Sequence, residues 1–307
     1  MAAQHCVSVG PVTCGADQLF LISGPCVIED EAIMMQTAER LKTASQRLDL
    51  PLIFKSSFMK DNRSAIEHFH GPGLDKGLEL LAKIRETFDV PIITDVHFPE
   101  QILPTAEVVD VIQIPAYLCM QTELVVSAAK TGRAVNLKHG QFLAPANMIK
   151  PVQKIESFGY RYILLTERGY TFGYNDLIVD PRSFYELRQI GYPVVFDITH
   201  SIRRYGIPSK DPRGSSREYL KTIARAGVAA GVDGIGVAEF KSHLQRYWPT
   251  IKAKLLAGGY IPSAVRRVDI PKPQGGVRTL GSATLTDGLI QQALHQVLSP
   301  IFEPTFS

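Results

Sequence analysis

Short apolar runs alternate with amphipathic stretches along the first 240 residues of the chain. The runs are rich in β-branched residues and are apolar on consecutive positions, a pattern typical of parallel strands that are covered on both faces. We predict seven strands and a weaker eighth. Their ranges are 19–26, 50–58, 90–97, 108–116, 134–142, 160–169, 193–200 and, for the weaker one, 232–237.

Helical periodicity fills many of the gaps between these runs. The predicted helices are Glu29 to Leu48, Leu74 to Phe88, Gln121 to Thr131, Met148 to Phe158 and Ser216 to Ala230. Seven or eight such units predict an α/β fold of the (β/α)₈ TIM-barrel type. No GxGxxG follows the first strand, which argues against a dinucleotide-binding fold. The segment CVSVGPVTCG, residues 6–15, predicts a small hairpin that closes the bottom of the barrel.

The alternation of apolar runs and amphipathic stretches ends after about residue 238. Residues 243–259 predict a helix, residues 265–281 a hairpin with a Pro-Gln-Gly-Gly turn, and the following stretch an amphipathic helix capped near Thr286 or Asp287. None of this is a βα unit, so the eighth unit is predicted to be replaced or disrupted. We therefore predict two domains, 1–235 and 236–307.

Composition narrows the class of protein. The chain has 307 residues, of which 45% are hydrophobic and 21% charged, as expected for a packed core. It has no run of 18 apolar residues, and its start lacks the features of a secretory signal, so we expect a cytoplasmic protein with no membrane span. The four cysteines match no zinc-ribbon spacing.

Positive charge gathers in the tail. Residues 240–307 hold eight Lys or Arg and three Asp or Glu, so they carry +5, although the whole chain carries only +3. Such a shift is typical of a domain boundary and of a segment that meets polyanions.

Polar side chains stand at the carboxyl end of nearly every predicted strand, where barrel enzymes collect their catalytic groups. The residues are Cys26, Lys55, Asp95, His97, Gln113, Lys138, Gln141, Glu167, Arg168, Asp197 and His200. Any one charge in a strand is most often incidental. Three strand-borne cations (Lys55, Lys138 and Arg168) at one mouth are costly without anionic partners, which points to a small phosphorylated, carboxylated substrate.

Several motifs together resemble the 3-deoxy-D-manno-octulosonate 8-phosphate synthase family, in register over about residues 5–235. They are GPCVIE, FKSSFMKDNRS, GPGL, TDVH, IQIPAYLC, NLKHGQF, TERGYTFGYNDLIVD and FDITHS. The sister heptulosonate-phosphate synthase has the same fold but a different segment where this chain reads KDNRS, and it ranks second.

The resemblance implies a transferase that condenses phosphoenolpyruvate with D-arabinose 5-phosphate and water, for lipopolysaccharide precursor synthesis, and releases phosphate. It implies catalytic roles for Lys60, Asp95 and Asp197. The substrate-binding residues that it implies are Lys55, Asn62, Arg63, Ser64, Gln113, Lys138 and Arg168. It also implies a homo-oligomer, a tetramer in the relatives.

The family has members with and without a divalent metal of the Mn, Fe, Zn or Co class, and no organic cofactor is implied. Cys26 and His200 match two metal ligands of the first kind. Ala238 stands where a Glu ligand belongs, and Glu239 comes one residue late, so its side chain would point to the opposite face of a strand. We expect weak metal binding or none, with Glu239 as a possible replacement.

From about residue 231 onward the chain resembles the N-terminal part of group II intron reverse transcriptase/maturases. The stretches are GVDGIGVAEF, WPTIKAKLLAGGYIPSAVRRVDIPKPQGGVRTLG and LIQQALHQVLSPIFEPTFS. The fragment ends before any polymerase aspartates, and we expect no RNA binding by the tail. A working synthase, an RNA-binding remnant and a catalytically dead fusion remain as alternatives.

Overall fold

The computed structural model describes residues 5–16, 18–63, 65–171, 177–204, 207, 211–230, 266–271 and 277–282. The chain divides into two compact units, 1–237 and 238–307. Each is described by itself.

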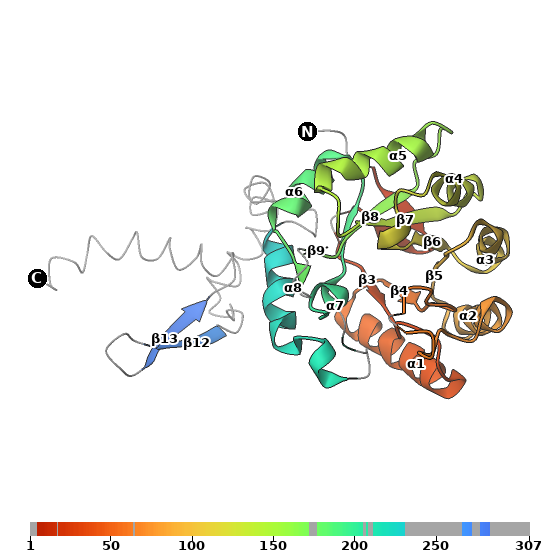
Figure 1. The fold of residues 1–307 in the computed structure, drawn as a ribbon. Coiled ribbons are helices and arrows are strands. Elements are labelled where there is room, and N and C mark those ends of the chain that lie inside the picture. The colour runs from red at the N-terminus through yellow and green to blue at the C-terminus, as the bar shows by residue number, and fades with distance from the viewer. Residues whose placement is uncertain are drawn as a thin grey trace, which may run out of the picture. The chain divides into compact units, whose positions relative to one another are not determined.

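The first unit is built on a curled sheet of seven parallel strands with helices on its outside (Figure 1). The strand order is β11-β8-β7-β6-β5-β4-β3. The bounds are β3 Leu21–Ser23, β4 Leu52–Lys55, β5 Ile92–Asp95, β6 Val111–Ile114, β7 Ala134–Lys138, β8 Ile163–Glu167 and β11 Val194–Phe196. Seven predicted strands and the TIM-type fold class are thus confirmed, and the eighth candidate, 232–237, lies outside the described residues.

Alternation along the strands sorts their side chains into layers. Ile53, Ile93, Val111, Ala134 and Leu164 form one apolar cluster at the amino end of the sheet. Two residues further along the same strands come Lys55, Asp95, Gln113, Asn136 and Thr166, which share the same side of the pleat. The intervening apolar residues, such as Phe54, Ile92 and Leu165, join the larger core between sheet and helices.

The N-terminal hairpin covers the apolar end of this interior. Strand β1 (Val7–Val9) pairs antiparallel with β2 (Val12–Cys14). Val7, Val9, Val12 and Cys14 are buried in the same cluster as Ile53 and its neighbours. The predicted hairpin at the bottom of the barrel is therefore confirmed.

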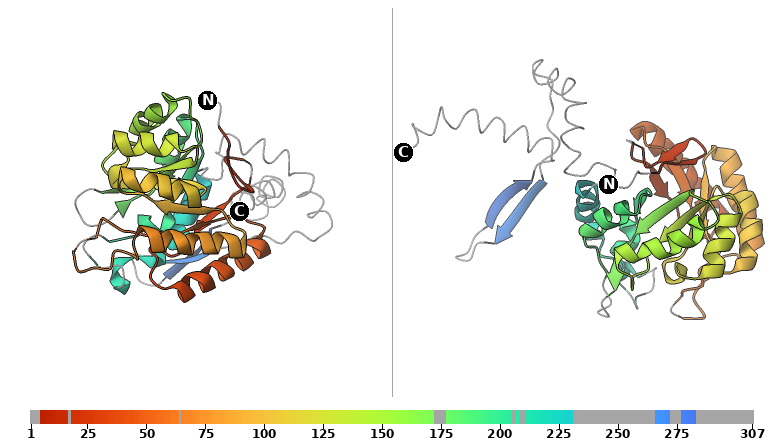
Figure 2. Two further views of the ribbon diagram at one scale, coloured as in Figure 1. Left: turned by 90° about the vertical axis from the view of Figure 1, so that its right-hand side faces the viewer. Right: turned by 90° about the horizontal axis from the view of Figure 1, so that it is seen from above.

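The five predicted helices are present. They are α1 (Glu31–Leu48), α2 (Leu74–Phe88), α4 (Thr122–Lys130), α5 (Ile149–Glu156) and α8 (Leu220–Ala229), the last two each preceded by a short 3₁₀ turn. Figure 2 shows the helices of the first half of the chain side by side over the outer face of the sheet.

Two further outer helices were not predicted. Helix α3 (Ile102–Val108) contains Pro104, a residue unfavourable inside helices, but the proline is the third helical residue and its missing N–H costs no internal bond there. Helix α6 (Arg182–Gln189) has only eight residues, too few for a clear period.

All seven predicted strand ranges are longer than the strands in the structure, and one of them includes a helix. Residues 193–200 were predicted as a strand, but β11 ends at Phe196 and the one-turn helix α7 (Ile198–Ser201) follows. Asp197 causes the change because its Oδ1 accepts the backbone N–H of His200 at 3.0 Å, which caps the new helix.

In the second unit, β12 (Arg266–Pro271) pairs antiparallel with β13 (Val277–Ser282), so the predicted hairpin is confirmed. The predicted turn and the two predicted tail helices lie outside the described residues. None of the described helices combines the length and the apolar character that a membrane span requires.

Candidate active site

Asp95, the last residue of β5, is the centre of a buried polar cluster at the carboxyl ends of the strands. Its Oδ2 accepts hydrogen bonds from Lys60 Nζ and, at 2.6 Å, from Ser57 Oγ, and it lies 3.8 Å from Lys55 Nζ. Its Oδ1 accepts from Gln113 Nε2. The structure thus brings together four of the predicted site residues. Ser57 was missed, although it belongs to the quoted motif.

The charges in this cluster are coupled. Burial alone would raise the pKa of Asp95, but Lys55, Lys60 and Lys138 hold it well below its ordinary range. Burial lowers the pKa of Lys55. Burial also opposes the charge on Lys60, but Asp95 outweighs it and raises the pKa of that lysine. One carboxylate among several lysines leaves spare positive charge at the mouth, suited to an anionic ligand.

Gln113 connects Asp95 to two residues that sequence reasoning missed. Asn136 Nδ2 donates to Gln113 Oε1 at 2.9 Å, and Thr166 Oγ1 donates to Asn136 Oδ1 at 2.7 Å. All are buried. The alternation of side chains along a strand could have identified Asn136 and Thr166, because each lies two residues beyond an inward-facing apolar residue of its strand.

A second chain of contacts begins at Lys138, the last residue of β7. Lys138 Nζ donates to Asp197 Oδ2, which also lies 2.7 Å from His200 Nδ1. His200 Nε2 in turn lies 3.7 Å from Cys26 Sγ. The structure therefore joins the two predicted metal ligands to a predicted catalytic carboxylate and a predicted phosphate-binding lysine.

Two groups in this chain of contacts, Asp197 and Cys26, have shifted pKa values. Burial would raise the pKa of Asp197, but His200 and Lys138 lower it well below its usual range. Around Cys26, exclusion of water by neighbouring atoms would raise the pKa of the thiol. The hydrogen bond to His200 and the charges of Lys60 and Lys55 lower it to about 5. A thiolate and a neutral ring nitrogen are the forms that bind metals.

Cys26 and His200 fit each other as ligands of a single ion. A thiolate and an imidazole on one tetrahedral Zn²⁺ stand about 3.6 Å apart, close to the 3.7 Å between Sγ and Nε2. The contact of Asp197 with His200 Nδ1 is the usual outer support of such a ligand. Within the described ranges, however, no group of three or more His, Cys, Asp or Glu is placed to hold a metal. Ala238 and Glu239 lie outside those ranges, so the residues on view do not complete a metal site.

Arg168 and its neighbours form the third part of the site. Arg168 is buried just beyond β8, where its backbone N–H donates to Glu167 Oε1 at 2.8 Å. Glu167 Oε2 lies 3.0 Å from Nδ1 of His139, whose Nε2 lies 2.9 Å from the carbonyl oxygen of Leu143. Burial would raise the pKa of Glu167, but His139 and the N–H of Gly169 lower it. Glu167 was named from the sequence and His139 was missed; their contact connects the end of β8 to the loop after β7.

The residues predicted to bind the sugar lie in the loop after β4. Asn62 is exposed, and Arg63 is half-buried with its Nε donating to the carbonyl oxygen of Phe69 at 3.0 Å. Ser64 lies outside the described residues. Arg63 and Cys26 line the same cavity of ≈ 190 Å³, together with Pro25, Val27, Glu29, Asp30, Ile33 and Met34.

Two further polar residues predicted at the strand ends, His97 and Gln141, are buried. Burial lowers the pKa of His97, whose backbone N–H donates to Gln101 Oε1 at 2.8 Å. Gln141 is buried in the loop after β7, and its carbonyl oxygen accepts the N–H of Thr171 at 3.2 Å.

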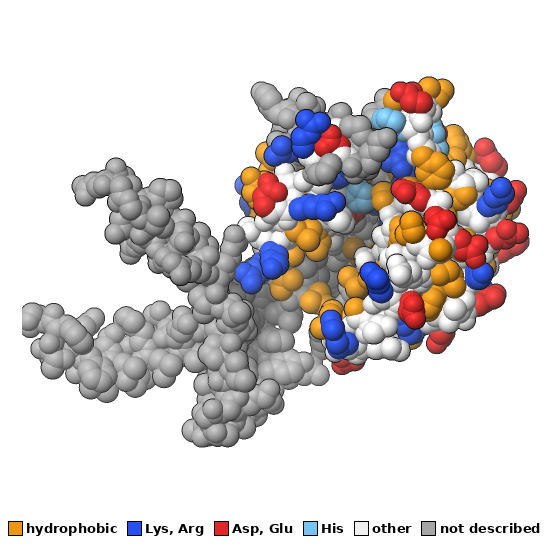
Figure 3. Space-filling view, turned by 90° about the horizontal axis from the view of Figure 1, so that it is seen from below, with side chains coloured by type: hydrophobic (Ala, Val, Ile, Leu, Met, Phe, Trp, Pro, Cys, Tyr) orange, Lys and Arg blue, Asp and Glu red, His pale blue; other side chains and the backbone are white. Residues whose placement is uncertain are grey.

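The face of the molecule in Figure 3 shows hydrophobic side chains interspersed with Lys, Arg, Asp and Glu.

A curled parallel sheet with converging lysines and a carboxylate at its carboxyl edge is the arrangement of a TIM-type enzyme for anionic substrates. The model of the DAHP synthetase I family matches residues 4–245. This chain belongs to that family. Its relatives include proteins named 2-dehydro-3-deoxyphosphooctonate aldolase from Trichlorobacter lovleyi and Geotalea daltonii. They are 52% and 51% identical over 230 residues, which cover 75% of this chain and 84% of each relative.

Proposed function

We infer that this protein is a transferase that condenses phosphoenolpyruvate with D-arabinose 5-phosphate and water to give 3-deoxy-D-manno-octulosonate 8-phosphate and phosphate. The observation that carries the inference is the Asp95 cluster, in which Lys55, Lys60 and Gln113 meet one carboxylate at the mouth of the sheet. About 50% identity to proteins named for this product supports it.

The reaction forms one carbon–carbon bond and loses one phosphate. C3 of phosphoenolpyruvate attacks the sugar aldehyde, whose oxygen takes up a proton as water adds at C2. The bond from C2 to the phosphate oxygen then breaks, the phosphate leaves with the second proton of the added water, and the oxygen of that water becomes the new carbonyl. Charge moves from the enol phosphate onto the aldehyde oxygen and the departing phosphate. Fixed cations in a mouth with little water stabilise both.

We assign the residues as follows. Lys138 and Arg168 hold the phosphate of phosphoenolpyruvate, and Lys55 and Gln113 line its pocket. Lys60 lies between the two substrates and stabilises the developing oxyanion. Support for the last role comes from its hydrogen bond to Asp95, which orients the ammonium and raises its pKa.

Asp95 and Asp197 orient groups around the reacting carbons. Asn62, Arg63 and Ser64 take the sugar and its phosphate. Support for this last assignment comes from Arg63, which shares a cavity with Cys26 close to the lysines.

The sister heptulosonate-phosphate synthase reaction, with a four-carbon sugar phosphate, is the alternative. Phosphate release should be measured with phosphoenolpyruvate and either arabinose 5-phosphate or erythrose 4-phosphate. We expect kcat/KM to favour the five-carbon sugar by about 100-fold or more, because the phosphate contacts are positioned for one chain length. A preference for erythrose 4-phosphate would establish the alternative.

A matched pair of arginine variants tests the sugar site. Arg63→Ala should raise KM for arabinose 5-phosphate by about 10- to 100-fold, since it removes a charge-assisted phosphate contact. Arg161→Ala is the control, because Arg161 lies beside His5 and Glu156 at the opposite end of the sheet. Equal effects of the two substitutions would contradict the assignment.

We propose Cys26 and His200 as ligands of a divalent metal, and we assign no step of the reaction to that metal. It would polarise a substrate oxygen if bound. The metal content of the purified protein, compared with that of Cys26→Ala, measures its presence directly. Equal metal in both would exclude Cys26 as a ligand.

We also propose a cytoplasmic homo-oligomer whose tail descends from a maturase-like coding sequence. Support for the tail's origin is the quoted run of resemblance and the β12–β13 hairpin within it. Light scattering at several concentrations measures the oligomeric state. The tail adds no assigned activity.

A further inference from the structure

A row of four buried polar side chains crosses the inside of the sheet. Thr166 Oγ1 donates to Asn136 Oδ1 at 2.7 Å, Asn136 Nδ2 donates to Gln113 Oε1 at 2.9 Å, and Gln113 Nε2 donates to Asp95 Oδ1. The four residues come from four neighbouring strands, β8, β7, β6 and β5. Each is at most 3% exposed, so water does not compete for these groups.

Backbone pairing sets the row. Gln113 is the register partner of both Asp95 and Asn136, so these three side chains stand abreast on one side of the pleat. Thr166 pairs with Lys138, two residues beyond Asn136, and its hydroxyl reaches Asn136 diagonally. Strand pairing fixes the backbone that carries each of these side chains. The row therefore has little freedom to form in a different arrangement.

The row has a direction. Ionised Asp95 accepts only, so Gln113 must present its NH₂ to it and its carbonyl oxygen to the next residue. Asn136 must then present its NH₂ to Gln113 and its own carbonyl oxygen to Thr166. Thr166 completes the sequence because its hydroxyl can donate. Each amide therefore has one orientation that leaves no buried group unpaired.

We propose that Asn136 and Thr166 are positioning residues for the reaction, and that the Thr166 hydroxyl holds Asn136 and Gln113 in place and, through them, the Asp95 carboxylate. This inference rests on the proposed function. Neither residue needs to touch substrate. Without the Thr166 hydroxyl, Asn136 Oδ1 loses its donor, so the Asn136 amide is no longer held against Gln113 and Gln113 is held less firmly against Asp95.

Asp95 also holds Lys60, Lys55 and Ser57 by its other oxygen. A carboxylate that loses its partner on Oδ1 rotates and misplaces the ammonium of Lys60. The row therefore connects a hydroxyl on β8 to the proposed oxyanion stabiliser beyond β4. A small error in that position lowers the rate of the chemical step.

Three threonine variants test the proposal. Thr166→Val keeps the shape and removes the donor, and we expect kcat to fall about ten-fold, the value of one buried hydrogen bond. KM for phosphoenolpyruvate should stay within about twofold, because the substrate contacts remain. Thr166→Ser restores the hydroxyl and should restore kcat.

Thr94→Val is the matched control. Thr94 lies on β5, the strand that ends in Asp95, is fully buried, and its Oγ1 has no hydrogen-bond partner among the described residues. It should leave kcat unchanged. Circular dichroism on each variant gives the folded fraction, so that kcat is expressed per folded molecule.

The proposal is overturned if Thr166→Val keeps the wild-type kcat, or if Thr166→Ser is as slow as Thr166→Val while both are folded. It is also overturned if Thr94→Val slows the reaction equally. Absence of phosphate release from the wild-type protein would instead contradict the proposed function, so the two failures are distinguishable.

Discussion

At the residue scale, the site depends on carboxylates that are kept ionised where water is excluded. Asp95 and Asp197 each collect lysine or histidine partners, and each has a pKa well below its usual range. A buried carboxylate of this kind is stable only while its partners remain. Removing one partner leaves an uncompensated buried charge.

Asp95→Asn should therefore destabilise the fold by about 3–5 kcal/mol at neutral pH, because Lys55 and Lys60 lose their common partner. The pKa of Asp95 is lowered by folding, so its stabilisation is present above its unfolded pKa of about 3.9 and is lost as pH falls through its lower folded value. The difference from wild type should be constant above about pH 5 and shrink below about pH 4.

Urea unfolding followed by circular dichroism at several pH values measures this difference. Glu107→Gln, at an exposed position of α3, is the control and should change stability little. An Asp95→Asn protein as stable as wild type at pH 7 would contradict the account of the cluster.

Lys138→Met should lower kcat/KM for phosphoenolpyruvate by about 100-fold or more, because the proposed phosphate contact is lost and Asp197 loses its ammonium partner. Lys130→Met is the matched control. Lys130 lies over the ring of Phe158, 5.0 Å from its centroid, on the outer surface. Steady-state phosphate release from both variants checks the prediction, and an unchanged kcat/KM in Lys138→Met would contradict the role.

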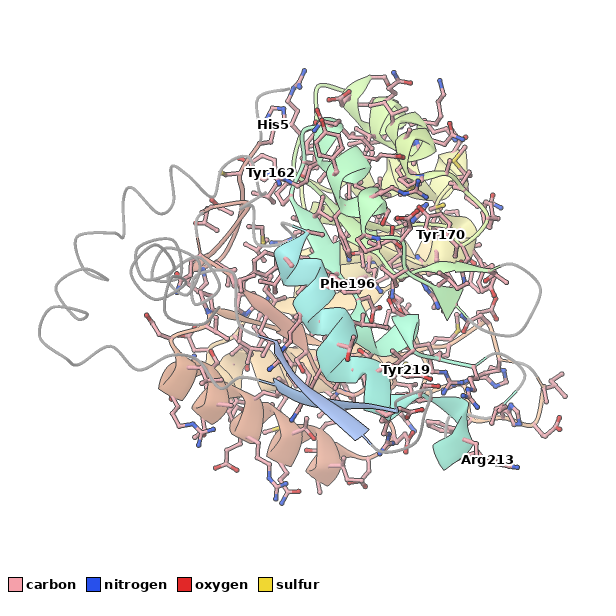
Figure 4. All side chains as sticks on the ribbon, turned by 90° about the vertical axis from the view of Figure 1, so that its left-hand side faces the viewer. His5, Tyr162, Tyr170, Phe196, Arg213 and Tyr219 are labelled. Atoms are coloured by element: carbon pink, nitrogen blue, oxygen red, sulfur yellow. The ribbon has the colours of Figure 1, made fainter. Side chains whose placement is uncertain are left out.

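At the element scale, close contacts between helices and strand-end loops hold the site in place. Gly77 of α2 faces Phe58, in the loop that leads to Lys60, and a Cβ on Gly77 would come 2.2 Å from the Phe58 Cβ. Gly227 of α8 faces the ring of Phe196 in the same way, and Figure 4 shows Phe196 beside that helix. The glycines let the helices approach the sheet.

Gly77→Ala tests the first contact. In an open helix the change would stabilise by up to about 1 kcal/mol, but here the clash should cost more, for a net loss of about 1–3 kcal/mol. The loss should appear as a lower melting temperature and a slower reaction, since Phe58 and the loop move together. Glu79→Ala, on the exposed face of the same helix, should change neither. A Gly77→Ala protein as stable and as fast as wild type would show that the loop adapts freely.

Helices and strands with a clear pattern of apolar and polar positions could be predicted from the sequence. The face of the sheet to which each side chain points could be predicted only in part. Lys55, Asp95, Gln113 and Lys138 were found because polar residues at the ends of apolar strands are conspicuous. Asn136 and Thr166 were missed because a strand in an all-parallel sheet is apolar on both faces. The sequence pattern therefore does not show which side chains face the inside of the sheet until the strand pairing is known. Asp197 could not be placed correctly because its capping bond ends the strand.

At the scale of the whole molecule, the chain divides into a first unit, residues 1–237, which the family match covers almost completely, and a second unit, residues 238–307. The positive charge of residues 240–307 is of the kind that binds RNA, but we assign the activity to the first unit. Treatment with RNase should therefore leave phosphate release unchanged, and RNA should not co-purify in a salt-sensitive manner. Activity that rises or falls with RNase would give the tail a functional role.

The most direct measurement of the central claim is the identity of the product formed by the intact protein. Phosphoenolpyruvate and arabinose 5-phosphate should be incubated with wild type and with Lys138→Met, and the products analysed by mass spectrometry and ³¹P NMR. We predict that wild type forms an eight-carbon 3-deoxy-2-keto acid phosphate and one equivalent of inorganic phosphate, and that the variant forms far less. Consumption of phosphoenolpyruvate without this product, or no reaction by a folded wild-type protein, would contradict the account.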